Sequence, residues 1–407
     1  MKACAKCGAC SVVCPVYRVT GREAHTARGK IHLTQVPELA GQGTVYEDIF
    51  SKCLLCGACA AVCPRDIDVR REVVAARAAF PVIYGEHGYE KYLARKALAH
   101  PETLGALRVL GRLGADLMTR YLPAESGLRL RLALFRQDVE EQVSTGPAPD
   151  NGQPASRGSQ QILTYFPGCT GRYLFPTIAA ACHALLADHG YDLQAPAGLS
   201  CCGLAALSAG DRSEARRCAR HNIAALALSS GPILVSCASC YAHLRQYPEL
   251  FADDEPWRHK AEAIQARLVE LSCFLDTHPP AVSASPGAGP PKIRIYYHDP
   301  CHFRHGLQGQ QIIAEPRRVL GRHPALELLE LPGGSECCGQ GGLFHISAPE
   351  IAAVIRDTLA AKVLALAPDV ITSTCSGCLM QWRLAVERAG SRVPVLHLAE
   401  LLATVAE

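Results

Sequence analysis

The sequence lacks several features that would place it in a common functional class. None of its apolar runs reaches the ~18 residues that a membrane-spanning helix needs. Its 41 basic and 38 acidic residues nearly cancel to a net charge of +3, so it lacks the single-signed charge expected of a nucleic-acid-binding protein. It also has no evident nicotinamide, flavin or nucleotide fingerprint. We therefore expect no nucleic-acid partner and no flavin or nicotinamide bound to this chain.

The opening segment, MKACAKCGAC, lacks the apolar core of a secretory signal. This predicts a cytoplasmic chain, in a compartment where thiols are kept reduced. What the sequence does contain is cysteine, with 21 residues in 407. So many cysteines in a reducing compartment cannot form a disulfide framework, and they indicate bound metal.

Two segments rich in proline, glycine and serine divide the chain, and both are typical of linkers: residues 144–160 and 276–291. The part before the first linker, residues 1–143, has a cysteine-dense head followed by a helical pattern. The two later parts, residues 161–275 and 292–407, each alternate apolar strand-like runs with amphipathic helical stretches. We therefore predict an α+β multidomain chain, in which a helical domain precedes two duplicated α/β modules.

The head carries the pattern C-x2-C-x2-C-x3-C-P twice, as CAKCGACSVVCP and CLLCGACAAVCP. This is the spacing of bacterial ferredoxins with two [4Fe–4S] clusters, in which the fourth cysteine of each run ligates the cluster of the other run. Zinc fits worse, because it usually takes two C-x2-C pairs separated by a longer loop. The predicted ligand sets are Cys4, Cys7, Cys10 and Cys63 for one cluster, and Cys53, Cys56, Cys59 and Cys14 for the other.

The two runs are separated by residues 15–52, a longer connection than a minimal ferredoxin has. We expect a helix to begin within TARGKIHL, residues 26–33, which favours a helical two-cluster ferredoxin over the compact β-hairpin type. Arg28 and Lys30 lie in this segment. Two interpretations stand: these cations offset the negative charge of a reduced cluster, or they belong to a solvated helix start.

Each of the two later modules contains five cysteines at closely matched spacing, in the order Cys, Cys-Cys-Gly, Cys-x2-Cys. Metal ligands need such a register, whereas core cysteines do not, and the ends of parallel strands are the expected place for the site. Five thiolates exceed what zinc or an ordinary cubane requires. Spacing alone leaves open a fused or open iron–sulfur cluster, a four-ligand site with a spare cysteine, and zinc. The candidate ligands are Cys169, Cys201, Cys202, Cys237 and Cys240 in the first module, and Cys301, Cys337, Cys338, Cys375 and Cys378 in the second.

These motifs resemble those of a known family, the iron–sulfur subunits of glycolate oxidase and bacterial D-lactate dehydrogenases. The chain is also similar to the catalytic subunit of heterodisulfide reductase and to the iron–sulfur subunit of anaerobic glycerol-3-phosphate dehydrogenase. The resemblance rests on the two CGAC…CP runs, on TGREAHTARGKIHL and on the two CCG modules, and it covers essentially the whole chain. It implies a helical two-[4Fe–4S] ferredoxin domain followed by two cysteine-rich CCG domains, of which one or both hold a non-cubane [4Fe–4S] cluster.

The same resemblance implies an electron-transfer subunit of a flavin-dependent oxidase or dehydrogenase for a 2-hydroxy acid, glycolate or D-lactate. FAD would lie on a partner chain, and this chain would pass electrons to a quinone or another acceptor, with no catalytic residue of its own. The alternative is reduction of a thiol-disulfide at a non-cubane cluster, which the completeness of both modules favours. The amphipathic segment 104–122 suits packing against the head, or peripheral contact with the inner face of a membrane.

Several further residues are not assigned to the clusters. Cys182, Cys218 and Cys273 lie in apolar helical stretches and are predicted to be core residues. The glycine-rich segment 339–342 is predicted to form a tight turn, because it lacks the context of a phosphate-binding loop. The histidines that flank Cys301 are predicted to have a structural or ligand-supporting role, with proton donation as the alternative. They are His298, His302 and His305.

Overall fold

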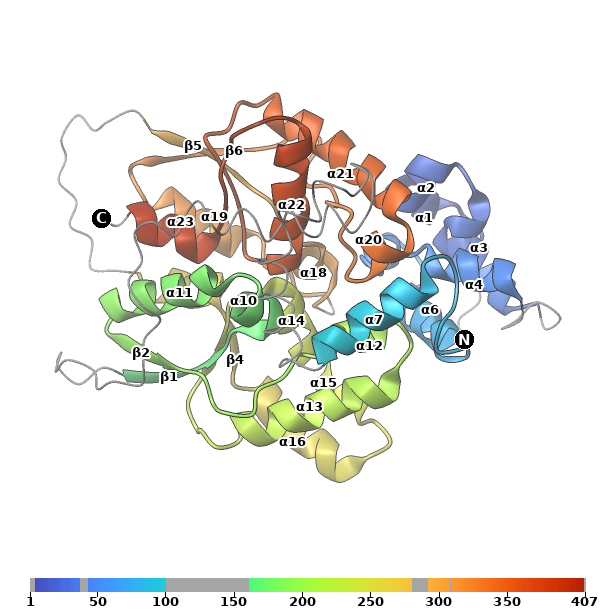
Figure 1. Ribbon diagram of the computed structural model, residues 1–407, viewed down its shortest axis with the longest axis horizontal. Helices are drawn as coiled ribbons and strands as arrows, with labels where there is room; N and C mark the ends of the chain where they lie inside the picture. Colours follow the sequence, from blue (N-terminus) through green and yellow to red (C-terminus); the bar gives the residue numbers. More distant parts are fainter. Residues whose placement is uncertain (1–3, 37–42, 100–160, 280–291, 308, 406–407) are drawn as a thin grey trace, which may run out of the picture.

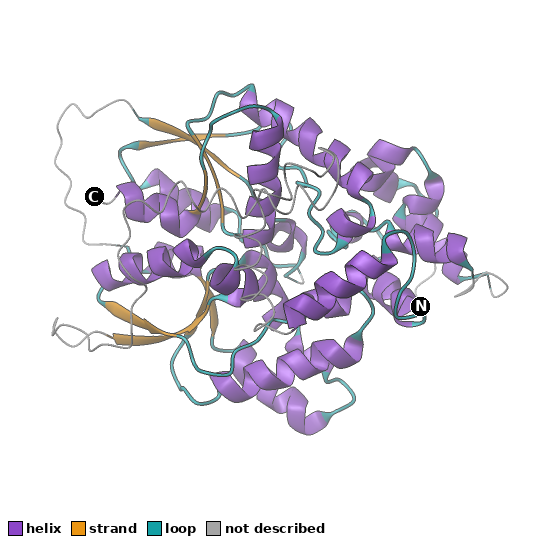
Figure 2. Cartoon of the chain, viewed as in Figure 1, coloured by secondary structure: helices purple, strands orange, loops and turns teal. Residues whose placement is uncertain are grey.

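The computed structural model describes residues 4–36, 43–99, 161–279, 292–307 and 309–405. A helical head lies beside two α/β modules, and among the described residues the strands belong to the modules (Figure 1). Figure 2 shows that helices surround each of the two sheets. This architecture confirms the predicted fold class, a helical domain followed by two duplicated α/β units.

Some of the predicted segments lie outside the described residues. These are the amphipathic segment 104–122, the linker 144–160 and the greater part of the second linker, residues 280–291. The predicted helical extension of the head is described up to residue 99, and it contains helices there. No helix in the described part of the chain combines the length and apolar character that crossing a membrane requires.

The head is built from short helices around two loops of equal conformation. Gly8 and Gly57 each follow the second cysteine of a run, and both have φ 81° and ψ −5°. This left-handed conformation is readily adopted only by glycine, so the repeated CGAC motif fixes the same turn twice. The helices are α1 Ala9–Val13, α2 Pro15–Thr20, the 3-10 helix η1 Glu23–His25, α3 Ala27–Thr34, α4 Thr44–Ser51, α5 Ala58–Ala61, α6 Val69–Ala78 and α7 Gly88–Ala99.

The helix expected within residues 26–33 is α3. Thr26 caps it, because its side chain accepts a hydrogen bond from the backbone N–H of Gly29 at 3.0 Å. Gly29 is required there for space, since a Cβ would lie 2.3 Å from the carbonyl oxygen of Glu23. The sequence TARGK therefore begins a helix that presses closely on η1.

The first module contains a four-stranded parallel sheet with the strand order β2-β1-β3-β4. Its central strands are short apolar runs, as parallel strands covered on both faces require. The strands are β1 Gln161–Phe166, β2 Tyr191–Gln194, β3 Ile233–Val235 and β4 Leu268–Glu270, and the helices are α10 Gly168–Tyr173, α11 Pro176–Asp188, α12 Leu204–Ser208, α13 Arg212–Leu226, α14 Ala238–Leu244, α15 Tyr247–Leu250, α16 Glu255–Gln265 and α17 Leu271–Thr277.

The second module repeats this plan, with a parallel sheet in the order β6-β5-β7-β8. The equivalent strand order in both sheets is the topological evidence for the duplication that the sequence predicted. The strands are β5 Ile293–Tyr297, β6 Leu326–Leu329, β7 Val370–Ser373 and β8 Val395–His397, and the helices are α18 Cys301–His305, α19 Ala314–Gly321, α20 Phe344–Ser347, α21 Pro349–Leu364, α22 Ser376–Arg388 and α23 Leu398–Val405.

The two modules share one apolar core. A single cluster of buried side chains runs from Tyr165 in the first sheet to Trp382 on α22 of the second module. Helices α11 and α23 lie side by side between the sheets (Figure 1). The His397 ring, at the end of β8, hydrogen-bonds the carbonyl of Ser236 in the first module at 2.9 Å. The modules therefore form one body.

The head is fixed to both modules. Against the second module it buries an apolar cluster that includes Val16 and Leu54 from the head and Phe344 from α20. Towards the first module, the buried guanidinium of Arg77 on α6 donates to the carbonyl of Ser208 at 2.6 Å. Its other donors bind carbonyls in the segment 50–53, which leads into the second cysteine run. The second cysteine loop is thus held against the modules.

Candidate iron–sulfur sites

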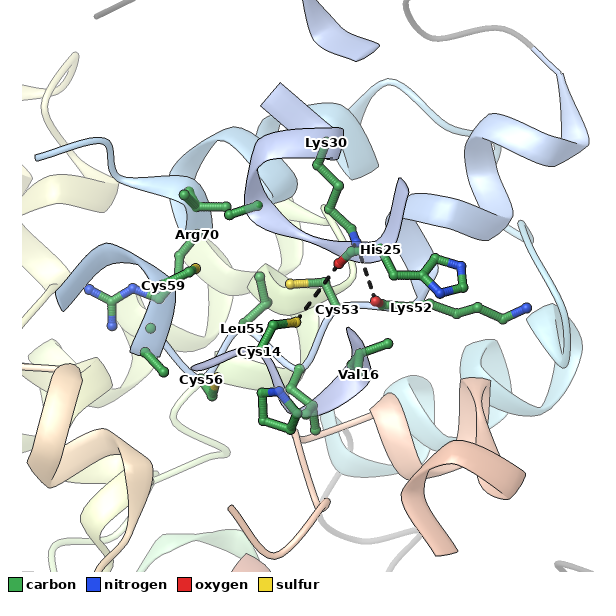
Figure 3. Close-up of a pocket in the computed structure, with 16 residues that line it drawn as sticks. Cys14, Val16, His25, Lys30, Lys52, Cys53, Leu55, Cys56, Cys59 and Arg70 are labelled. Atoms are coloured by element: carbon green, nitrogen blue, oxygen red, sulfur yellow. Dashed lines mark hydrogen bonds between the residues drawn. The ribbon is translucent and has the colours of Figure 1, made fainter. Parts of the chain in front are cut away.

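The inner head site is a cavity of about 450 Å³ between α2, α3 and the second cysteine loop. Four cysteines line it, and they are the four that the ferredoxin pattern groups together: Cys14, Cys53, Cys56 and Cys59 (Figure 3). Burial, together with the neighbouring Cys53, Cys14 and Cys10 thiols, raises the pKa of Cys59 to about 12. A cation or an iron cluster is therefore needed to hold this set of thiols as thiolates.

The outer head site is a second hollow, between the first cysteine loop and residues 63–65. It is lined by the other predicted set, Cys4, Cys7, Cys10 and Cys63. Cys7 is exposed, and it is the only exposed cysteine among the described residues. The fourth cysteine of each run thus lines the same cavity as the first three of the other run.

In the first module, the five motif cysteines come together at one edge of the sheet. Cys169 and Cys237 follow the adjacent central strands β1 and β3, whose carboxyl ends meet there. Cys201 lies 3.6 Å from Cys169, sulfur to sulfur. Hydrogen bonds between the thiols of Cys169 and Cys201, and between those of Cys202 and Cys240, complete the set. All five side chains are buried.

In the second module, the corresponding five cysteines gather at the same edge. Cys301 opens α18 after β5, and Cys375 caps α22 after β7. Cys338 contacts Cys378 through a hydrogen bond between the thiols. Burial and the nearby Cys338 and Cys301 thiols raise the pKa of Cys337, which brings the fifth cysteine into the group.

The double cysteine is followed by glycine in both modules for a structural reason. Gly203 and Gly339 have φ 93° and φ 83°, which side chains with a Cβ rarely adopt. A Cβ would also lie 3.1 Å from the carbonyl oxygen of Ala215 at Gly203, and 2.8 Å from that of Ala352 at Gly339. The CCG motif therefore directs two neighbouring thiols towards the site. Its glycine allows a helix, α13 in the first module and α21 in the second, to pack closely against the turn.

The four sites form a continuous row. Burial, followed by the Cys337 thiol, raises the pKa of Cys56, so the inner head site lies next to the second module's site. Hydrogen bonds from Cys240 and then from Cys375 lower the pKa of Cys237. Cys237 and Cys375 belong to different modules, and the sites of the two modules are therefore in direct contact. The order is outer head site, inner head site, second module, first module.

Two family models match the chain and cover these sites. A 4Fe-4S dicluster domain matches residues 1–67, and a cysteine-rich domain (CCG) matches twice, at residues 163–245 and 295–383. A crystal structure of a hypothetical protein from Helicobacter pylori has a TM-score of 0.51 at 8% identity, and the match covers 92% of this chain and 66% of that one. The similarity to this Helicobacter pylori structure concerns the fold alone.

Curated relatives extend over the same regions. The probable glycolate oxidase iron-sulfur subunit of Bacillus subtilis is 28% identical over 98% of this chain and 92% of its own length. Lactate utilization protein A of Exiguobacterium sp. is 30% identical over 59% of this chain and 96% of its own length. The chain belongs to this CCG iron–sulfur subunit family. One subunit of the fumarate reductase (CoM/CoB) of Methanothermobacter marburgensis is 28% identical over 59% of this chain and 45% of its own length.

The residues present in this CCG subunit fit iron–sulfur clusters. Each head cavity presents four cysteines in a loop whose backbone is fixed by glycine, and each module presents five buried or half-buried cysteines. Backbone N–H groups of Gly203 and Gly339 point at Cys201 and Cys337, with N–S distances of 3.5 and 3.4 Å. Such donors stabilise thiolate ligands of a cluster. Family membership makes the chain the iron–sulfur subunit of an oxidoreductase.

Several residues that the sequence singled out lie as expected. Cys182 and Cys218 are buried core residues, while Cys273 is half-buried on α17. Gly341 and Gly342 both have positive φ, so the glycine-rich segment is a turn. Lys30, in contrast, is buried beside the inner head site, and the interpretation of a solvated helix start is wrong for it.

The flanking histidines differ in their environment. The ring of His298 lies near Cys338 and Cys378, with ligating atoms of all three within 4.8 Å of one another. His302 contacts Cys301 at 3.8 Å between Nδ1 and sulfur. In the first module Phe166 stands three residues before Cys169, as His298 does before Cys301, so the histidine distinguishes the two module sites.

Sequence reasoning missed residues that act across module boundaries. The hydroxyl of Ser376 lies 3.3 Å from the sulfur of Cys237 and 2.5 Å from the hydroxyl of Thr170. His243 on α14 is buried, and burial lowers its pKa to about 4. The only feature of the sequence that marks Ser376 is its position inside the C-x2-C motif of the second module. No local pattern indicates that the Ser376 hydroxyl contacts Cys237 of the first module.

Proposed function

We propose that the chain is the electron-transfer subunit of a flavin-dependent dehydrogenase or oxidase for a 2-hydroxy acid, glycolate or D-lactate. Electrons would come from FAD on a partner chain and leave to a quinone or another acceptor. The supporting observation is the continuous row of four cysteine sites, of which one end is exposed and the others are more deeply buried. An iron–sulfur cluster accepts and releases one electron at a time, which suits such a row.

We assign two [4Fe–4S] clusters to the head and one non-cubane [4Fe–4S] cluster to each module. In the head, the separation of eight cysteines into two cavities supports the assignment. In the modules, the support is that five thiols converge and that neighbouring thiols lie in mutual contact. A zinc site would leave one of these thiols without a role.

The partner chain and the substrate class rest on relatives. One relative is named as the iron-sulfur subunit of a glycolate oxidase and another as a lactate utilization protein. A subunit implies a further chain, and this sequence offers no flavin-binding fingerprint. We therefore place the oxidation of the hydroxy acid on the partner, while this chain sets the path of the electrons.

A second candidate function is reduction of a thiol-disulfide at the module sites. It is favoured by the completeness of both five-cysteine sets and by the contact between Cys237 and Cys375, which places the two module sites side by side. In this case the head would deliver electrons inward to the modules.

The deciding experiment is anaerobic purification followed by iron and acid-labile sulfide analysis and EPR. About sixteen irons per chain are expected, from four irons in each of four clusters. Cys201→Ser should lower the iron content, whereas Cys182→Ser, a buried cysteine of the same module outside the motif, should leave it unchanged. A colourless, iron-free chain, or equal iron contents in the two variants, would contradict the assignment.

Co-purification distinguishes the two functions. With its flavoprotein partner present, the chain should be reduced by glycolate or D-lactate, as measured by bleaching of its visible absorption. Reduction by neither acid, combined with reoxidation of the reduced chain by an added organic disulfide, would favour the second candidate.

A further inference from the structure

The ammonium group of Lys30 is buried in the wall of the inner head site. The residue is 1% exposed. Its Nζ donates to the carbonyl of His25 at 2.6 Å and lies 3.4 Å from the carbonyl of Lys52 (Figure 3). Lys30 also lines the cavity that holds Cys14 and Cys53. A positive charge is thus placed at the site on a rigid helix, α3.

No carboxylate in the described part of the chain forms an ion pair with Lys30. Burial lowers its pKa, the nearby Cys53 and Cys14 thiols raise it, and the Arg77 cation lowers it. A buried ammonium without an anionic partner is costly. An anionic group held by the surrounding cysteines would supply the missing partner, and a reduced iron–sulfur cluster with four thiolates carries such a charge.

The outer head site has the same loop conformation but a different electrostatic environment. Two arginines line it: the exposed Arg65, and Arg28, whose side chain is 34% exposed. The Arg28 guanidinium is paired with the carboxylate of Glu23 at 2.6 Å, so its charge is largely neutralised and screened by solvent. Of the two head sites, as far as the structure describes them, the inner one therefore has a buried cation without a carboxylate ion-pair partner, and the outer one has only cations that are exposed or paired.

We infer that Lys30 sets the reduction potential of the inner head site above that of the outer one. This inference rests on the proposed function, because it requires a cluster at each site. A fixed positive charge stabilises the more negative, reduced state of a neighbouring cluster, and net charge is one of the factors that determine cluster potential. With a cluster at each site, one electron would pass from the outer cluster, which would be oxidised, to the inner cluster, which would be reduced; the negative charge gained at the inner site would favour the protonated form of Lys30. Lys30 thus draws electrons inward, towards the modules.

The test is an EPR-monitored redox titration of the full chain after anaerobic purification. In Lys30→Met the midpoint potential of one head cluster should shift to more negative values, while that of the other stays unchanged. Lys30→Arg, which retains the charge, should stay near the wild-type value. The matched control is Lys52→Met, because Lys52 lines the same cavity but pairs with Asp48 at 2.8 Å and Glu86 at 3.3 Å. Its shift should be much smaller.

Equal shifts in the two methionine variants, or no shift in Lys30→Met at full iron content, would overturn the inference. If Lys30→Met fails to retain its inner cluster, Lys30→Gln provides the same comparison, since its amide can still donate to a carbonyl but carries no charge. Failure of the proposed function is recognised separately. It would appear as a wild-type chain without head-cluster signals, whereas failure of this inference alone leaves those signals present and insensitive to residue 30.

Discussion

Glu270 is an acidic side chain that caps a helix from a fully buried position. It ends β4 and caps α17, accepting hydrogen bonds from the backbone N–H groups of Ser272 and Cys273 at 2.7 and 3.1 Å. It is fully buried, and its other oxygen has no hydrogen-bond partner among the described residues. Burial raises its pKa from 4.5 to about 7, and the charge of Glu315 acts in the same direction. The cap is therefore built with an acid that is costly to ionise.

This raised pKa makes a pH-dependent prediction. Between pH 4.5 and 7 the folded chain binds the Glu270 proton more tightly than the unfolded chain, so stability contributed by the protonated acid is lost as pH rises through about 7. Glu270→Gln keeps an acceptor for the cap but does not ionise. We expect the variant to be more stable than wild type at pH 8, by up to about 3 kcal/mol, and similar to it at pH 5. Thermal unfolding at the two pH values measures the difference.

The control is Glu262→Gln on the exposed face of α16, which should change neither midpoint. A Glu270→Gln variant that is destabilised equally at pH 5 and pH 8 would show that the carboxylate form is the one the cap needs. That outcome would contradict a raised pKa.

At the scale of elements, the two cysteine loops provide an internal comparison. Both loops share φ 81° at their glycine, but they face different neighbours. A Cβ at Gly8 would lie 3.3 Å from the flexible end of Arg28, whereas a Cβ at Gly57 would lie 3.0 Å from the Cβ and 3.2 Å from the carbonyl oxygen of His305 on α18. Gly57 is therefore required both by its own turn and by the contact between head and second module.

We predict that Gly57→Ala is more destabilising than Gly8→Ala. Both variants incur the backbone strain of a left-handed residue, about 1 kcal/mol, but only Gly57→Ala must also displace α18. The apparent thermal midpoint of the anaerobically purified chain should fall further for Gly57→Ala, and its head should be cleaved faster by added protease. Equal destabilisation by Gly57→Ala and Gly8→Ala would mean that the head and α18 can move apart at residue 57 without loss of stability.

Much of the fold and of the sites follows from local patterns. The ferredoxin spacing predicted which four cysteines share each head cavity, and the repeated strand and helix runs predicted two equivalent modules. The contact between Cys237 and Cys375 could not be predicted, because it joins residues far apart in sequence with no shared pattern. Nor could the burial of Lys30, because an amphipathic helix start does not reveal which helices will cover it.

At the scale of the whole molecule, the row of sites ends at the outer head site, where Cys7 is exposed in the part of the chain that the structure describes. The exposed Arg65 lines the outer head site, and the exposed Lys6 precedes Cys7 in the loop that forms it. The exposed side chains of Val12 and Val62 lie on the adjacent helical segments. A positively charged rim around an accessible site attracts negatively charged partners and increases their rate of encounter.

We therefore predict that oxidation of the reduced chain by ferricyanide, an anion, is slowed in the double variant Lys6→Glu, Arg65→Glu. Roughly a tenfold decrease is expected at low ionic strength, with most of the difference lost at high salt. Stopped-flow absorption measures the rate. Lys292→Glu is the control, since residue 292 precedes β5 at the amino end of the sheet, opposite to the cysteines. An equal loss of rate in the control would place the entry point elsewhere.

The contrast between the exposed Cys7 and the more deeply placed cysteines of the modules has a consequence for handling the protein. Dissolved oxygen would meet the row at the outer head site, which is also where electrons would enter under the proposed function. We therefore expect oxidative damage by air to begin at the outer head site and to proceed inward. Loss of a cluster there would interrupt electron transfer to inner sites that are still intact.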